Sequence, residues 1–211
     1  MIKVLIADDH EILREGVKRV INEQMGMKVE WEAESGSQLF SILSEETPDL
    51  LILDLNMPGR SGLDLLKQLL DMYPALKVLV LTMHPEERFA IRVFKAGAHG
   101  YLNKSTLKKD LISAVRKIVI EKRKYISPVV ADELAKQFDI DRKTPKHEEL
   151  SDREFQILCM IASGKYTKEI AQDLFLSPQT IHSYRNRIKE KMNLSSDVEI
   201  TRYVIEHRLL D

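Results

Sequence analysis

Polar side chains that could bind a metal ion and a phosphate follow short apolar runs in the first half of the sequence. Asp8 and Asp9 come directly after one run, and Asp54 comes directly after another. Thr82 and Lys104 follow two later runs. Any one of these residues alone would be an ordinary turn or capping residue. Five suitable residues behind successive runs together indicate a site.

The residue types point to phosphoryl transfer onto an aspartate. Carboxylates gathered in one site raise each other's pKa unless a cation neutralises them. Oxygen ligands of this kind suit Mg²⁺, which takes one or two carboxylates together with water and phosphate oxygens. Beside such an ion an aspartate can attack phosphorus and form an acyl phosphate. Lys104 would neutralise charge on the transferring group, and Thr82 could donate a hydrogen bond to it.

These residues can meet only if the apolar runs are neighbouring parallel strands. Runs 4–7, 50–53 and 78–81 are unbroken, as expected of strands covered on both faces, and 29–33 and 100–102 are weaker candidates. Amphipathic helical patterns lie between them at 12–25, 37–43, 63–72, 88–96 and 107–119. The alternation predicts an α/β, doubly wound domain with a five-stranded parallel sheet of the flavodoxin-like kind. Ligands of such sheets bind beyond the carboxyl ends of the strands, where the polar residues lie.

The rest of the sequence divides into a connecting segment and a purely helical region. Ser127 and Pro128 form an N-cap and first-turn pair, which predicts a short helix. Residues 139–149 are polar and lack apolar periodicity. We therefore expect a first domain over 1–122, a connecting helix and linker over 123–149, and a second domain over 150–211.

Start signals for four helices occur in the second domain, at Ser151, Thr167, Ser177 and Ser196. Ser151 and Ser196 each have a glutamate three residues later, which is the pattern of a capping box. A proline follows Ser177 at the first helical position. The pattern predicts a small all-α, four-helix domain.

The third of these helices has an apolar face and a polar face. Its apolar side is formed by Ile181, Tyr184, Ile188 and Met192. The opposite side carries Gln179, His182, Ser183 and Asn186, and positive charge surrounds it at Arg185, Arg187, Lys189 and Lys191. A short turn at 175–177 joins this helix to the preceding one. A polar, basic second helix in such a pair is typical of a helix-turn-helix that enters the major groove of double-stranded DNA. A basic amphipathic surface helix without a DNA partner is the alternative.

Composition narrows the class of protein. The 211 residues carry a net charge of -1 with 44% hydrophobic and 31% charged residues, so any basic surface must be local. The single Cys159 excludes a disulfide framework and a cysteine-rich zinc site. The sequence shows no signal-peptide pattern, and no apolar run approaches the roughly 20 residues of a membrane helix. A cytoplasmic protein without a membrane partner is therefore expected.

Four segments of the first half resemble the motifs of response-regulator receiver domains. They are ADDH at 7–10, LDLNMPG at 53–59, LT at 81–82 and AGAHGYLNK at 96–104. The resemblance extends from residue 1 to about residue 122. Many receivers have a proline after the lysine, whereas this sequence has Ser105, so the geometry of that loop does not carry over.

The resemblance implies a role for each matching residue. Asp54 would be the phosphoacceptor, and Lys104 would contact the phosphate. Thr82 and Tyr101 would form a switch pair, in which the ring moves inward as the threonine turns toward the phosphoryl group. The Mg²⁺ site would be made by Asp9, Asp54 and the carbonyl group of Asn56, with Asp8 assisting through water.

The second half resembles the LuxR-type helix-turn-helix, in segments 150–154, 168–171 and 177–182. Together with the receiver motifs this resembles the NarL/FixJ class over almost the entire chain. The polar face would read bases through Gln179, His182, Ser183 and Asn186. Contacts with DNA phosphates would come from Thr167, Lys168, Thr180, Arg185 and Lys189. The last helix, 197–206, would carry a dimer contact.

The sequence is therefore interpreted as a two-component response regulator. A sensor histidine kinase would phosphorylate Asp54, and the protein, as a homodimer when phosphorylated, would bind specific DNA sequences and regulate transcription. It is not expected to be an enzyme. An alternative is a Mg²⁺-dependent phosphotransferase or phosphatase, but such enzymes commonly have an acid two residues after the nucleophile, where this sequence has Asn56, and no substrate-specificity cap is evident. A receiver with a protein-binding output is a third possibility, against which the basic helix argues.

Overall fold

The computed structural model describes residues 1–57, 62–83, 86–136, 145–207 and 209–210. The chain forms two compact units, Met1–Phe138 and Asp139–Asp211, which are described separately below. Most of the expected linker, residues 139–144, lies outside the described residues.

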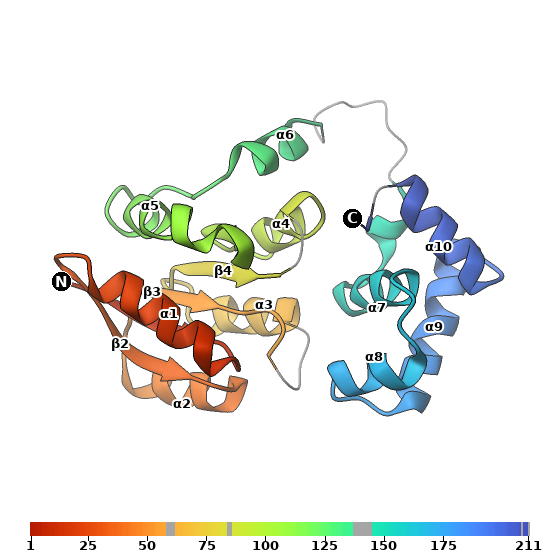
Figure 1. Ribbon diagram of the computed structural model, residues 1–211, viewed down its shortest axis with the longest axis horizontal. Coiled ribbons are helices and arrows are strands. Elements are labelled where there is room, and N and C mark those ends of the chain that lie inside the picture. Colours follow the sequence, from red (N-terminus) through yellow and green to blue (C-terminus); the bar gives the residue numbers. More distant parts are fainter. Residues whose placement is uncertain (58–61, 84–85, 137–144, 208, 211) are drawn as a thin grey trace. The chain divides into compact units, whose positions relative to one another are not determined.

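The first unit contains an all-parallel, five-stranded sheet in the order β2-β1-β3-β4-β5 (Figure 1). The strands are β1 (Ile2–Ala7), β2 (Met27–Ala33), β3 (Leu50–Leu53), β4 (Val78–Thr82) and β5 (Gly100–Asn103). Every residue of β3 and β4 is buried, because helices cover both faces of the sheet. The structure confirms the predicted fold class.

Five helices alternate with the strands. They are α1 (Glu11–Asn22), α2 (Gly36–Glu45), α3 (Gly62–Met72), α4 (Glu86–Lys95) and α5 (Leu107–Val119). Helices α1 and α5 contact each other and close one core, in which Val17 and Val115 pack against Ile6 and Ile52 of the sheet. Helices α2, α3 and α4 cover the opposite face (Figure 1). This double covering makes the strand ends the natural place for a polar site.

The register brings the carboxyl ends of neighbouring strands to one edge. Ala7 is paired with Leu53, and Leu53 is paired with Val80. At the next boundary Thr82 is paired with Asn103. Residues that directly follow β1, β3 and β5 therefore emerge beside one another.

A sixth helix, α6 (Pro128–Lys136), belongs to the first unit and packs against α4. The Ser127 hydroxyl accepts a hydrogen bond from the Val130 N–H at 3.3 Å, as expected of an N-cap, and Val130 is fully buried. Just before it, the Tyr125 N–H donates to the His99 carbonyl at 2.8 Å. The segment after α5 is thus attached to the edge of β5 and to α4.

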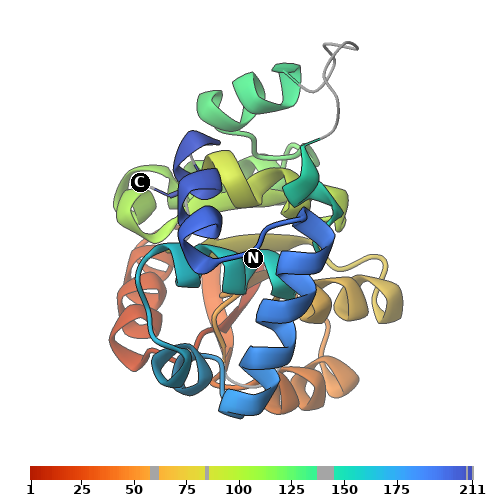
Figure 2. The ribbon, with the colours of Figure 1, turned by 90° about the vertical axis from the view of Figure 1, so that its right-hand side faces the viewer.

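The second unit is all-helical, as predicted. It contains the short 3₁₀ helix η2 (Lys146–Glu149) and α7 (Asp152–Ala162), α8 (Thr167–Asp173), α9 (Pro178–Met192) and α10 (Asp197–Glu206). In Figure 2, where this unit faces the viewer, α9 runs along one side of it. Its core is closed by buried residues from each of the four longer helices, among them Phe155, Ile170, Ile181 and Ile200.

The helix starts follow the predicted caps. Ser151 forms the full capping box with Glu154, and the Ser177 hydroxyl accepts from the N–H of Thr180, the third residue of α9. Ser196 accepts from the Glu199 N–H at 3.2 Å, but the Glu199 carboxylate takes the N–H of the residue before Ser196. Of the two hydrogen bonds of the second predicted capping box, one is therefore formed as expected. In the other, the Glu199 carboxylate accepts from Ser195 instead of Ser196.

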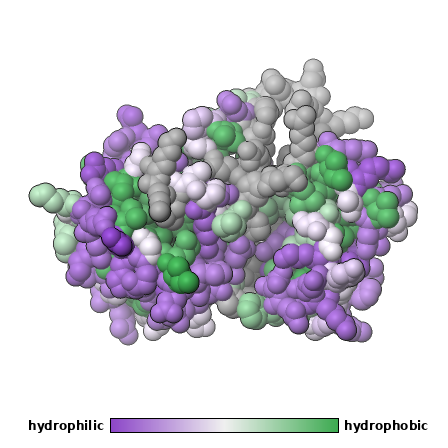
Figure 3. All heavy atoms as spheres, in the orientation of Figure 1, coloured by the Kyte–Doolittle hydropathy of each residue, from purple (hydrophilic) through white to green (hydrophobic). Residues whose placement is uncertain are grey.

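The surface of each unit is mostly hydrophilic on the face drawn in Figure 3, with apolar residues in small patches. None of the helices in the described ranges has both the length and the apolar character that crossing a membrane requires.

Gly62, the first residue of α3, packs against backbone atoms of Leu55. A Cβ atom at this position would lie 2.2 Å from the Leu55 carbonyl oxygen and 2.4 Å from its Cα. Backbone would have to move to admit it, so we expect Gly62→Ala to lower the free energy of unfolding by about 1–3 kcal/mol. Urea unfolding measures this change.

Gly16→Ala is the matched control, because Gly16 lies in the exposed part of α1 and a Cβ there meets nothing within 4 Å. Alanine should raise stability by about 0.5–1 kcal/mol at that helical position. A Gly62→Ala protein as stable as the parent would contradict the close approach to Leu55.

Glu154 joins α7 to α9 and its ionisation stabilises the second unit. Its buried carboxylate accepts from the Ser151 N–H at 2.8 Å and from Lys191 Nζ at 2.7 Å. Burial by itself raises the pKa of Glu154, but the Lys191 and Ser151 hydrogen bonds outweigh it and hold the pKa below the usual 4.5. This contribution is complete above about pH 4.5 and is lost as the pH falls through the lower pKa of the folded state.

Glu154→Gln should therefore lower the free energy of unfolding at pH 7 by about 1–2 kcal/mol and flatten the loss of stability below pH 4.5. Glu190→Gln, at an exposed position of α9, should leave both quantities nearly unchanged. Denaturation at a series of pH values compares the proteins. Parallel pH profiles for Glu154→Gln and the parent would contradict this role.

Candidate functional site

Two buried aspartates lie at the carboxyl edge of the sheet. Asp8 follows β1 and Asp54 follows β3, and each is 1% exposed. Backbone hydrogen bonds continue the sheet into both residues: the Asp8 N–H donates to the Ala33 carbonyl at 3.0 Å, and the Asp54 N–H donates to the Ala7 carbonyl at 2.8 Å. The ladder that forms the core thus also fixes the two carboxylates.

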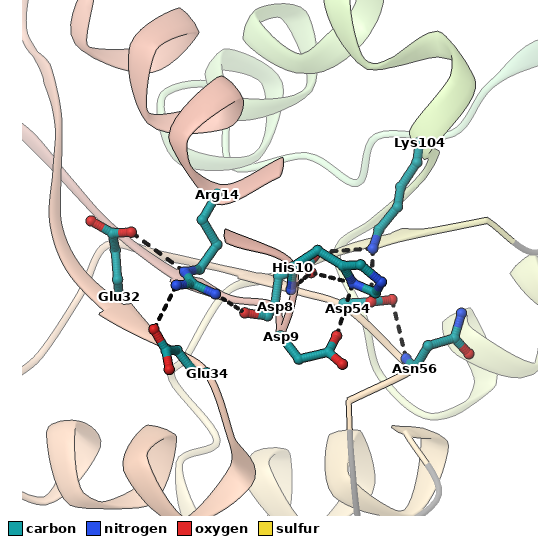
Figure 4. A network of polar contacts seen from close by, with 9 residues as sticks. All are labelled: Asp8, Asp9, His10, Arg14, Glu32, Glu34, Asp54, Asn56 and Lys104. Atoms are coloured by element: carbon teal, nitrogen blue, oxygen red, sulfur yellow. Dashed lines mark hydrogen bonds and ion pairs between the residues drawn. The ribbon is translucent and has the colours of Figure 1, made fainter. Parts of the chain in front are cut away.

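Lys104 bridges these two aspartates (Figure 4). Its Nζ lies 2.7 Å from Asp54 Oδ2 and 2.8 Å from Asp8 Oδ2, and its side chain is only 8% exposed. A buried carboxylate pair is costly without a cation, and the ammonium group supplies one. The structure brings together the three predicted residues from β1, β3 and β5.

The loop that carries Lys104 is held by Asn103. The Asn103 side-chain oxygen accepts from the Ser105 N–H at 2.9 Å and from the Ser105 hydroxyl at 2.7 Å. The short 3₁₀ helix η1 (Lys104–Thr106) follows directly. Ser105, which replaces the proline of many receivers, therefore stabilises this loop by hydrogen bonding.

Burial is the largest influence on the pKa values of Asp54 and Lys104. It raises the pKa of the Asp54 carboxyl, and the neighbouring Asp8 carboxylate acts in the same direction. Lys104 and the Asn56 N–H favour the ionised form but do not cancel the effect, so this pKa lies above its usual value. Burial alone would lower the pKa of Lys104, yet attraction to Asp54 and Asp8 raises it overall. A further cation beside Asp54 would favour its ionised, nucleophilic form.

The acidic cluster is able to bind a metal ion. Asp8, Asp9, His10 and Asp54 each offer a ligand atom, and these atoms all lie within 4.8 Å of one another. Asp8 Oδ2 and Asp9 Oδ1 are buried and form ion pairs, but neither accepts a well-oriented hydrogen bond from the described residues. Carboxylate oxygens gathered in this way fit a hard divalent cation. Asn56 borders the cluster, and its N–H donates to Asp54 Oδ1 at 3.1 Å.

Thr82 and Tyr101, the expected switch pair, lie on one face of the sheet. Tyr101 of β5 is paired with Val80 of β4, so these two side chains point to the same side of the sheet. Thr82 lies two residues after Val80 on β4, so its side chain points to that side as well. Thr82 is fully buried and Tyr101 is 1% exposed. The tyrosine ring is thus inside the protein in this structure.

Two residues beside the acidic cluster were not predicted to contact it. His10, the N-cap residue of α1, places Nδ1 2.9 Å from Asp9 Oδ1 and 3.1 Å from Asp8 Oδ1. Arg14 is buried beneath the cluster and donates to the Asp8 backbone carbonyl (Figure 4). A signal for Arg14 was present in the sequence, because it shares the inward face of α1 with Val17 and Ile21, where a charge is unexpected.

The predicted base-reading residues lie on the outer face of α9. Gln179, His182, Ser183 and Asn186 are all exposed. Three of the four residues predicted for the apolar face, Ile181, Ile188 and Met192, are buried. The fourth, Tyr184, is only half-buried. A shallow depression on the outer side is lined by Gln179, Thr180, Ser183, Tyr184 and Arg187.

The predicted phosphate contacts differ in their surroundings. Lys168 is exposed at the start of α8, beside the half-buried Thr167, and the Thr180 hydroxyl lies 2.8 Å from that of Ser177. Arg185 and Lys189 instead pair with Asp197 of α10, at 3.3 Å and 3.0 Å. The sequence pattern did not reveal this acid, which is the first residue of the next helix.

Comparison with known proteins agrees with this geometry. The family model of the response regulator receiver domain matches residues 4–116, and that of bacterial regulatory proteins of the luxR family matches residues 148–204. The chain is 37% identical over 212 residues to the response regulator GacA of Pseudomonas aeruginosa, covering all of this chain and 99% of the relative.

Solved structures give the same result. RcsB from Salmonella enterica serovar Typhimurium, bound to promoter rprA in the presence of phosphomimetic BeF3-, is 27% identical with a TM-score of 0.68. A structure of two RcsB dimers bound to two parallel DNAs is 28% identical with a TM-score of 0.62. Each match covers 96% of this chain and 97% of the other. The chain belongs to the response regulators of the NarL/FixJ class, with a receiver domain followed by a LuxR-type helix-turn-helix domain.

Proposed function

We propose that a partner sensor histidine kinase phosphorylates this response regulator on Asp54 and thereby controls its binding to double-stranded DNA. The observation that carries the proposal is the position of Lys104, which bridges Asp54 and Asp8 next to Asp9. A buried nucleophile, a neighbouring ammonium group and a cluster of carboxylate oxygens are the parts that phosphoryl transfer to an aspartate requires.

In the proposed reaction an Asp54 carboxylate oxygen attacks phosphorus and forms a new O–P bond. The P–N bond of the kinase phosphohistidine breaks, and the imidazole leaves with the electron pair and takes up a proton. Lys104 then moves from the Asp54 oxygen to a phosphoryl oxygen, which keeps the added negative charge paired. Mg²⁺, held by Asp8, Asp9, Asp54 and Asn56, would supply charge neutralisation during the transfer.

The switch proposal concerns Thr82 and Tyr101. The Thr82 hydroxyl would donate a hydrogen bond to the phosphoryl group, and the buried position of Tyr101 would be favoured when it does. Their common face and deep burial support this coupling. A phosphoryl group shifts such an equilibrium only through contacts that differ between the two states.

Enzymatic turnover is not part of the proposal. The family consists of transcription regulators. Enzymes that hydrolyse an aspartyl phosphate commonly use an acid two residues after the nucleophile, and Asn56 occupies that position here. Its N–H donates to Asp54, which holds the nucleophile without providing a proton shuttle.

DNA recognition is assigned to α9, the second helix of the helix-turn-helix. Its exposed polar face fits base edges in the major groove, and Lys168, Thr167 and Thr180 lie at helix starts suited to phosphate contacts. We place the homodimer contact on α10, whose outer surface exposes Val198 and Ile205. Action on chromosomal DNA would place the protein in the cytoplasm. We assign the receiver domain to 1–122 and the DNA-binding domain to 150–211, joined by a connecting segment whose helix α6 packs on α4 of the first unit.

Asp54→Asn should abolish labelling by a small phosphodonor such as acetyl phosphate in the presence of MgCl₂, because an amide cannot form the acyl phosphate. Intact-mass measurement should show one hydroxylamine-sensitive phosphoryl group on the parent protein. Asp64→Asn is the control, since Asp64 is an exposed carboxylate in the next helix, and it should be labelled like the parent. Full labelling of Asp54→Asn would refute the assignment.

On DNA, the exposed polar face of α9 and its basic residues should respond differently to substitution. His182→Ala or Asn186→Ala should cost about 1–3 kcal/mol on the preferred operator and relax selectivity at one base pair. Lys189→Ala should weaken binding to all sequences alike and lower the salt slope by at most about one unit, since Asp197 already neutralises part of its charge.

Binding titrations at several salt concentrations, on an operator and its single-base variants, separate these effects. A changed base preference in Lys189→Ala, with unchanged preference in both His182→Ala and Asn186→Ala, would disprove the docking proposed for α9.

A further inference from the structure

Arg14 is a buried charge at the functional end of the first unit. It lies in the first turns of α1, on the face of the helix that packs inward, and is only 5% exposed. Charged side chains are almost never buried unless they are paired, so the contacts of this residue define what it does.

The guanidinium group connects the end of β1 to the end of β2 (Figure 4). Arg14 Nη1 donates to the Asp8 backbone carbonyl at 2.8 Å, and Nη2 donates to Glu34 Oε1 at 2.6 Å. Arg14 Nε lies 3.5 Å from Glu32 Oε2. Two hydrogen bonds, supplemented by the longer ion pair with Glu32, therefore hold the guanidinium group.

These contacts continue the pairing of β1 and β2 beyond its last backbone hydrogen bond. That bond runs from the Asp8 N–H to the Ala33 carbonyl, where β2 ends. The next polar group on β1 is the Asp8 carbonyl, and a buried carbonyl needs a donor. Arg14 supplies that donor and is itself anchored to Glu34, one residue beyond Ala33.

The Asp8 carbonyl belongs to the peptide unit that joins Asp8 to Asp9. Because a peptide unit is planar, fixing the direction of this carbonyl also fixes the direction in which the chain enters Asp9. Asp8 and Asp9 are the two carboxylates that β1 contributes to the acidic cluster. Arg14 therefore influences the positions of both carboxylates through the backbone, by its hydrogen bond to the Asp8 carbonyl.

We propose that Arg14 is a positioning residue for the Mg²⁺ site, which it serves by fixing the Asp8–Asp9 peptide through its fork to Glu34. This inference rests on the proposed function, since it assumes that the acidic cluster binds Mg²⁺. Arginine suits the role because its planar fork reaches the carbonyl and the carboxylate together, whereas a lysine ammonium group is a single point.

If only the charge of Arg14 mattered, its removal would strengthen Mg²⁺ binding, which is the opposite of what positioning predicts. A guanidinium group beside a cation site repels the incoming ion, so removing its charge would strengthen Mg²⁺ binding if repulsion were all that mattered. Arg14→Lys keeps the charge and removes the fork. A loss of affinity in this variant therefore reports positioning and not electrostatics.

The test is a titration of the full-length protein with MgCl₂, followed by the amide resonances of Asp9 and Asn56. We expect Arg14→Lys to raise the Kd for Mg²⁺ about ten-fold, as is typical when a group that orients a ligand is altered. Arg19→Lys is the matched control, because Arg19 lies on the same helix, is 83% exposed and pairs with Glu23. It should bind Mg²⁺ like the parent.

Melting temperatures without Mg²⁺ separate positioning from simple stabilisation. An unchanged Kd in a folded Arg14→Lys protein, even one that melts at a lower temperature, would overturn the proposal and leave a structural role only. If the parent protein showed no Mg²⁺-dependent shift at Asp9 or Asn56, the metal site itself would be refuted.

Glu34→Gln is the second variant and remains informative if Arg14→Lys does not fold. It weakens the anchor of the guanidinium group and leaves every carboxylate of the site in place. Glu30→Gln, on β2 just before Glu34 and paired with Lys28, is its charge-matched control. We expect a higher Kd for Mg²⁺ in Glu34→Gln than in Glu30→Gln, and equal values would count against the role of Arg14.

Discussion

The ammonium group of Lys104 lies between two carboxylates that the sheet buries, and the first unit depends on this interaction. Asp8 and Asp54 are held by backbone hydrogen bonds and cannot turn toward solvent, so their mutual repulsion must be compensated where they are. One cation shared by two acids leaves carboxylate oxygens in excess. That excess gives the site its capacity for a metal ion. Burial, and to a smaller extent the neighbouring Asp8 carboxylate, raises the pKa of Asp54 above its usual value.

The second unit balances charge differently, by pairing basic residues of α9 with acids of its own neighbours. Lys191 is paired with the buried Glu154, whereas Arg185 and Lys189 share the half-exposed Asp197. The Glu154 pair helps to hold two helices together, so Lys191 is committed to the fold. The pairs with Asp197 are partly buried, so a DNA phosphate would have to compete with Asp197 for Arg185 and Lys189. This arrangement is consistent with a chain of net charge -1 that presents positive charge locally.

The sequence predicted what depends on periodicity and on chain order. Apolar runs identified the strands, and ligands gather at the carboxyl ends of parallel strands, so the sequence alone predicted that Asp8, Asp54 and Lys104 lie together. Arg14 and Asp197 escaped prediction because their roles depend on how one helix packs against another element. The same is true of α6. Ser127 indicated where this helix starts, but no local sequence pattern could predict that it packs on α4.

Phosphorylation of Asp54 would change the charge balance around Lys104 more than the charge balance anywhere else in the molecule. A phosphoryl group on Asp54 would add negative charge and oxygen acceptors where one ammonium group already serves two acids, so Lys104 would have to divide its contacts anew. The segments nearest this change are the ends of β4 and β5, which carry Thr82 and Lys104. Helix α4 follows β4 in the chain, and α6 packs on α4 just before the segment that leads to the second unit. A shift at the end of β4 that displaced α4 would therefore also displace α6, which packs on it, without requiring a change in the buried sheet.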